Sequence, residues 1–97
     1  MGLIHRREYE EIIQDLTAAI LQIRDLHLFF AMETKDWDDL LNNERKELAL
    51  TMADDLFYAL DEEHELRIGK GRVIYLMSTS TIEVYEGHKL IETVRLN

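Results

Sequence analysis

The chain contains no cysteine, no proline and only four glycines among its 97 residues. Without cysteine it cannot form a disulfide, bind zinc through thiolates or use a cysteine nucleophile. No uninterrupted apolar run approaches the ~18 residues of a membrane-spanning helix. The N-terminal stretch MGLIHRREYE also lacks the apolar core of a signal peptide. We therefore expect a cytoplasmic protein that does not enter a membrane.

Patterns that carry catalysis are equally scarce. There is no glycine-rich phosphate-binding loop, and the cluster STST has no neighbouring His or Asp that could activate a nucleophile. Glutamate pairs at helical spacing, such as Glu8 with Glu11 and Glu44 with Glu47, are typical of hydrolases that hold magnesium between helices. These pairs fall at helix ends, where acidic residues are common, so a metal-dependent hydrolase is only an alternative. The sequence predicts no enzyme, no cofactor and no metal.

The stretch DWDDLLNNE is rich in oxygen ligands and has the composition of a calcium-binding loop. The register fails, however, because Leu40 occupies a position that needs an oxygen ligand. Helix capping explains the same residues. Thr34 or Asp36 would cap one short helix, and Asn42 or Asn43 would cap the helix that follows. We therefore interpret this stretch as two helix starts.

An apolar stripe runs through residues 6–33 with no glycine or proline to interrupt it. Its members recur at steps of four and three, the seven-residue repeat of an α-helix that packs along one seam. They are Tyr9, Ile13, Leu16, Ile20, Ile23, His27 and Phe30. A helix of about 25 residues would be ~38 Å long, which is long for so small a domain. The stripe is also wider than one partner helix covers, so we predict a homodimer through this helix. The residues expected at its self-association seam are Ile20, Ile23, His27 and Phe30.

A second helix is predicted over residues 43–63, where Leu48, Met52 and Leu56 recur at steps of four. The connection that contains Trp37 is short, so the two long helices should form an antiparallel pair joined by a short helix. After Glu65 the composition changes to β-branched and aromatic residues separated by turn residues. Three or four strands are predicted, at 66–68, 72–77, 81–86 and 89–96.

The predicted architecture is a single α+β domain over residues 1–97, with a helical half at 1–64 and a β half at 65–97. The strands should form an antiparallel meander with one face packed on the helices.

The formal charge of −9 is concentrated in the middle of the chain. Residues 34–66 carry three basic and eleven acidic residues, whereas residues 67–97 carry five basic and three acidic residues. Clustered acids repel phosphates and anionic lipids, so nucleic acid and membranes are poor partners. A winged-helix DNA-binding regulator has a similar order of elements and is the second alternative.

The favoured function is therefore a non-enzymatic interaction protein, such as a small regulator or inhibitor, whose acidic face meets a basic partner surface. Trp37 is the candidate aromatic anchor. The acidic face is assigned to Asp54, Asp55, Asp61, Glu62 and Glu63.

Overall fold

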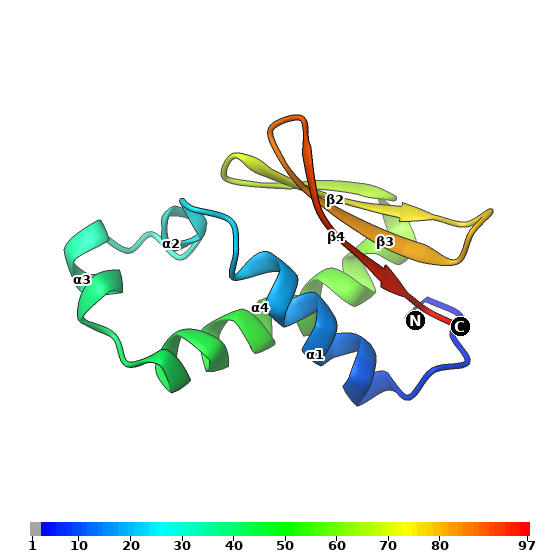
Figure 1. Ribbon diagram of the computed structural model, residues 1–97, viewed down its shortest axis with the longest axis horizontal. Coiled ribbons are helices and arrows are strands. Elements are labelled where there is room, and N and C mark those ends of the chain that lie inside the picture. The colour runs from blue at the N-terminus through cyan, green and yellow to red at the C-terminus, as the bar shows by residue number, and fades with distance from the viewer. Residues whose placement is uncertain (1–2) are drawn as a thin grey trace.

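The computed structural model describes residues 3–97, in which four helices precede a four-stranded antiparallel sheet (Figure 1). The helices are α1 (Tyr9–Ile20), α2 (Leu26–Phe29), α3 (Thr34–Asp39) and α4 (Asn42–Glu62). The strands are β1 (Glu65–Ile68), β2 (Gly71–Leu76), β3 (Thr81–Glu86) and β4 (Lys89–Arg95). The predicted α+β class, with the helices first and the sheet last, is confirmed.

The sheet is a meander in which each strand pairs with the next, in the order β1-β2-β3-β4. Two-residue turns join β1 to β2 and β3 to β4, and each has a glycine with positive φ at its first position, Gly69 (φ 59) and Gly87 (φ 61). Glycine adopts that conformation without steric cost, and the position is the one that type II′ hairpins require. The local sequence therefore specifies both turns.

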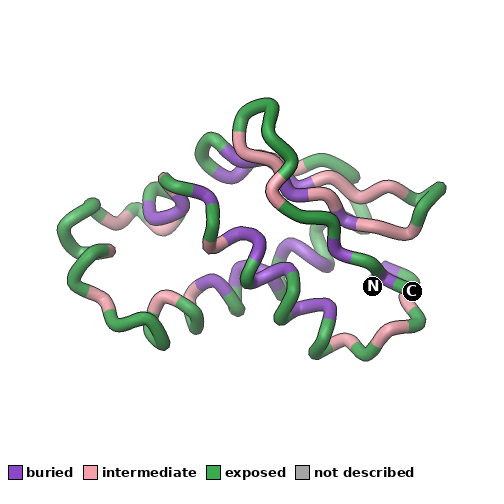
Figure 2. Tube along the Cα trace, in the orientation of Figure 1, coloured by how far each residue is buried: buried purple, intermediate pink, exposed green. Residues whose placement is uncertain are grey.

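The helices cover one face of the sheet. Figure 1 shows α1 crossing α4 beneath the strands, and the buried residues in Figure 2 gather where the two helices meet each other and the sheet. The largest fully buried side chains include Ile12, Leu16 and Ile20 of α1, Phe57 and Leu60 of α4, and Val73, Ile82, Val84 and Val94 of the sheet. One core thus joins both halves of the chain.

The long helix predicted over residues 6–33 is wrong. Helix α1 has 12 residues and ends at Ile20, and the four-residue α2 begins only at Leu26. Between them the backbone tightens into i→i−3 hydrogen bonds, from the N–H of Gln22 to Ala19 and from the N–H of Ile23 to Ile20. No proline or glycine lies in this segment, so the cause of the break is tertiary.

Residues 21–25 dock onto the turn end of the sheet. Ile23 is buried against Gly71, where an added Cβ would lie only 2.5 Å from the Ile23 Cδ1 atom. The Asp25 carboxylate accepts a hydrogen bond from the backbone N–H of Lys70 at 3.2 Å. The backbone N–H of Arg24 donates to the Glu86 carboxylate at 2.7 Å. These three contacts favour the break over a continuous helix.

The capping side chains differ from the expectation. Neither Thr34 nor Asp36 caps α3, and the Thr34 hydroxyl instead lies 3.0 Å from the Nε2 atom of His27. At the start of α4, the Glu44 carboxylate accepts the backbone N–H of Leu41 at 2.8 Å, while no asparagine side chain caps the helix. Glutamate at the third helical position is the reciprocal half of a capping box, so it replaces the predicted cap.

The residues predicted at the self-association seam are largely inside the monomer. Ile20 is fully buried, Ile23 is 2% exposed and His27 is 8% exposed. Phe30 is half-buried and stacks on Trp37. The helix break turns the stripe into the core, so these side chains do not form the exposed seam that the continuous helix implied.

Replacing Gly71 with alanine tests the docking of the helix break. The new Cβ would lie 2.5 Å from Ile23 Cδ1 and 3.1 Å from the backbone oxygen of Tyr85. We expect G71A to lower the free energy of unfolding by about 1–3 kcal/mol through overpacking, measured by urea denaturation.

The matched control is G87A, because nothing lies within 4 Å of a Cβ built at Gly87. Its cost should be limited to the positive φ, at about 1 kcal/mol. A G71A variant as stable as the wild type would contradict the docking.

Candidate functional site

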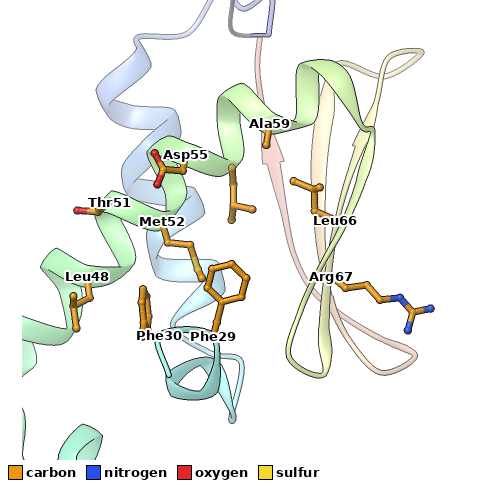
Figure 3. Close-up of a pocket in the computed structure, with 10 residues that line it drawn as sticks. Phe29, Phe30, Leu48, Thr51, Met52, Asp55, Ala59, Leu66 and Arg67 are labelled. Atoms are coloured by element: carbon orange, nitrogen blue, oxygen red, sulfur yellow. The ribbon is translucent and has the colours of Figure 1, made fainter. Parts of the chain in front are cut away.

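The main candidate site is an open apolar groove of about 580 Å³ between α2, α4 and β1 (Figure 3). It is lined by Phe29, Phe30, Leu48, Thr51, Met52, Asp55, Leu56, Ala59, Leu66 and Arg67. Most of these side chains are apolar, and the charged ones are a single carboxylate and a single guanidinium. Concave, mostly apolar sites with a few polar groups are the usual form of a binding site.

Helix α4 supplies the floor of the groove. Leu48, Met52 and Leu56 recur every four residues and therefore share one face of the helix over about two turns. Met52 and Leu56 belong to the core, whereas Leu48 is only half-buried. Ala59 is exposed and extends the floor toward β1, where its short side chain leaves the groove open.

Helix α2 supplies one wall. Phe29 is 54% exposed and packs edge-to-face on Phe30, with 6.1 Å between their ring centroids. Both rings project from α2 toward the part of α4 that carries Met52 (Figure 3). Phe29 therefore adds exposed aromatic area to the side of the apolar groove, and burying that area against a ligand would be favourable.

Trp37, the predicted anchor, lies outside the groove and is half-buried. Its ring stacks on Phe30 with 6.1 Å between centroids, and the Arg45 guanidinium lies over it at 5.5 Å. Arg45 also donates to the Trp37 carbonyl oxygen at 3.0 Å. Trp37 therefore fastens α2, α3 and α4 together and supports the aromatic wall from behind.

A buried histidine completes this corner. The Nε2 atom of His27 faces the Thr34 hydroxyl, and its ring lies 6.3 Å from the Trp37 ring. Its Nδ1 atom is buried without a hydrogen-bond partner among residues 3–97. His27 is thus part of the packing that holds α2 against α3.

The predicted acidic face divides between two sides of α4. The Asp54 carboxylate accepts a hydrogen bond from the Tyr9 hydroxyl of α1, whereas Asp55 lies on the rim of the groove. Neighbouring helical residues point about 100° apart, and these two carboxylates accordingly have different neighbours. Asp61 and Glu62 follow them seven residues later on the same two sides, and the exposed Glu63 comes directly after the last residue of the helix.

Asp54 is committed to a structural contact. Burial raises the pKa of the Tyr9 phenol well above its ordinary value, and the hydrogen bond to the Asp54 carboxylate raises it further. The phenol therefore stays protonated at neutral pH and donates to Asp54, which ties α1 to α4. Of the predicted acidic residues, only Asp55 lines the groove.

Other kinds of site find little support in the part of the chain that the structure describes. Within residues 3–97, no three His, Asp or Glu side chains converge as metal ligands would. In the same range no helix has both the length and the apolar character needed to cross a bilayer. Helix α4, which a winged-helix protein would place on DNA, exposes Asp54, Asp55, Asp61 and Glu62.

Comparison with known proteins gives no relative from which a role could be carried over. No protein-family model, no curated protein and no solved structure matches this chain.

The groove itself was missed by the sequence reasoning. Phe29 and Leu48 fit the apolar patterns of two helices and give no sign of being exposed. The groove exists because the chain breaks after Ile20 and carries α2 to the side of α4, which no local pattern indicates. The one sequence feature that could have indicated an exposed apolar surface was the excess width of the apolar stripe over residues 6–33.

Truncation of Trp37 should destabilise the fold much more than truncation of Phe29. Trp37→Ala removes the stack on Phe30 and the Arg45 contact, so we expect it to lower the free energy of unfolding by about 2 kcal/mol. Phe29→Ala removes a side chain that is 54% exposed and should cost about 0.5 kcal/mol or less. Urea denaturation followed by far-ultraviolet circular dichroism measures both. Equal losses would contradict the assignment of Trp37 to support and Phe29 to the open wall.

Proposed function

We propose that this chain is a non-enzymatic protein-binding module, a small regulator or inhibitor, that takes an apolar segment of another protein into the groove between α2, α4 and β1. The observation that carries the proposal is the exposed Phe29 ring beside a continuous apolar floor. Aromatic side chains in such positions commonly supply much of the binding energy at protein interfaces.

The negative charge of the chain favours basic residues on either side of the apolar segment that binds. Asp55 lies on the rim of the groove and Glu62 lies two turns further along the same side of α4, where both are exposed. With a net charge of −9, the chain attracts a basic surface at long range. We therefore expect an apolar segment flanked by lysine or arginine, whose association slows as salt is added.

Several contacts hold α2, the wall of the groove that carries Phe29, in a fixed position. The Phe30–Trp37 stack and the two hydrogen bonds from Arg45 to the Trp37 and Asp38 carbonyl oxygens hold α2 and α3 against the start of α4. A side chain that is already positioned loses less conformational entropy when a partner binds.

The experiment is affinity capture from a cell lysate with the immobilised full chain, followed by measurement of the purified partner by calorimetry. The groove variant Phe29→Glu should lower the affinity at least tenfold, because it places a charge where apolar contact is needed. Its matched control is Leu90→Glu on β4, since Leu90 is another exposed apolar residue, 44% exposed, outside the groove lining.

The affinities of the three proteins distinguish binding in the groove from binding elsewhere on the molecule. The proposal requires the partner to bind the wild type and Leu90→Glu alike and to bind Phe29→Glu weakly, with a negative heat-capacity change on binding. A partner that binds all three proteins equally would place the interaction elsewhere on the molecule. Raising the salt concentration should slow association if the acidic flank contributes.

A further inference from the structure

The outer edge of β1 has no neighbouring strand among residues 3–97. In the order β1-β2-β3-β4, β1 lies at one side of the sheet and is bonded only to β2. Hydrogen-bonded and non-hydrogen-bonded pairs alternate along an antiparallel hairpin. The His64 carbonyl oxygen accepts the Tyr75 N–H at 2.7 Å, so the next pair, Glu65 with Ile74, is a non-hydrogen-bonded one. The backbone groups of Glu65 therefore point away from β2.

The same alternation applies to Arg67, two residues further along β1 and opposite Arg72. Its N–H and C=O also point outward, and no backbone partner for them is present among residues 3–97. Open strand edges of this kind pair readily with another strand unless something blocks them. β1 contains no proline, and its pairing with β2 is regular over all four residues.

The Arg67 side chain lies beside like charge. It shares the outer face of the sheet with Arg72 directly opposite, a pairing that is unfavourable across two strands. Arg72 has its own partners, since its guanidinium lies 3.6 Å from the Glu65 carboxylate and 4.9 Å from the centre of the Tyr85 ring. No carboxylate lies within salt-bridge distance of Arg67 in the described chain.

We propose that the edge of β1 binds β1 of a second copy of this chain, antiparallel and centred on Leu66, so that two sheets join across a two-fold axis. In that register Glu65 of each copy lies opposite Arg67 of the other. Both residues present outward backbone groups, so each of the two pairs forms a hydrogen-bonded site. The Arg67 guanidinium gains the carboxylate that it lacks in the monomer.

Neighbouring registers are less favourable. The backbone alternation also permits pairing centred on Glu65 or on Arg67, but these place two carboxylates or two guanidiniums directly opposite each other. Centring on Leu66 is the register that places opposite charges together at both sites. It also places the two half-buried Leu66 side chains opposite each other, on the face of the sheet that packs on the helices.

The dimer does not involve the buried stripe of α1, but it shares Leu66 and Arg67 with the lining of the groove. A four-residue strand pair is a small interface, so we expect a dissociation constant roughly in the micromolar to millimolar range. The two proposals are still distinguished by their tests, because the groove test depends on Phe29 and the dimer test depends on the charges at positions 65 and 67.

Charge exchange tests the proposal. Light scattering and sedimentation over a concentration series up to about 1 mM would be applied to the wild type, to Glu65→Arg, to Arg67→Glu and to the double variant. Each single change puts like charges opposite at both sites and should raise the dissociation constant roughly tenfold or more. The double variant restores opposite charges in the reversed sense and should dimerise about as well as the wild type.

Two control variants and a folding measurement distinguish an effect on strand pairing from an effect of net charge or of misfolding. Glu62→Arg and Lys89→Glu change the charge by the same amounts at exposed positions outside β1 and should leave dimerisation unchanged. Circular dichroism confirms that each variant is folded. A wild type that stays monomeric throughout, single variants that dimerise normally, or a double variant as weak as the single ones would each overturn the proposal.

Discussion

The arrangement of this molecule depends on the docking of residues 21–25 onto the turn between β1 and β2. Ile23 occupies the space that a side chain at position 71 would fill, and Asp25 accepts the N–H of Lys70. These contacts join segments about 45 residues apart in the sequence. They end α1 at the sheet and carry α2 to the side of α4, and the groove is the space enclosed by that change of direction.

Local signals predicted the sheet well, because strand alternation and the glycine turns are properties of neighbouring residues. The strands lie within two residues of their predicted bounds, and α4 is displaced by one residue from the predicted 43–63. The break after Ile20 was not predictable, since its causes lie on β2, on β3 and in the turn between β1 and β2. The separation of Asp54 from Asp55, by contrast, follows from helical geometry alone. The role of Trp37 in supporting the aromatic wall depends on the position of α2, which the sequence did not indicate.

Apolar and charged surfaces have different positions and suit different contacts. Exposed apolar area lies at the α2 end of the groove around Phe29, while acidic side chains flank it along α4. Such an arrangement favours a partner that is both apolar and basic, with charge setting the association rate and the groove setting the lifetime. Glu65 and Arg67, the two residues that the proposed dimer would use, lie on β1, the strand that borders the groove.

The most direct test of the central claim is a nuclear Overhauser effect between the Ile23 δ1 methyl group and the α protons of Gly71. The docked break predicts a strong signal, because Ile23 Cδ1 lies 2.5 Å from the position of a Cβ at Gly71. It also predicts that the sequential helical contacts of α1 stop after Ile20. A continuous series of i to i+4 helical contacts from Ile20 through His27, without the Ile23–Gly71 signal, would contradict the docking and with it the groove.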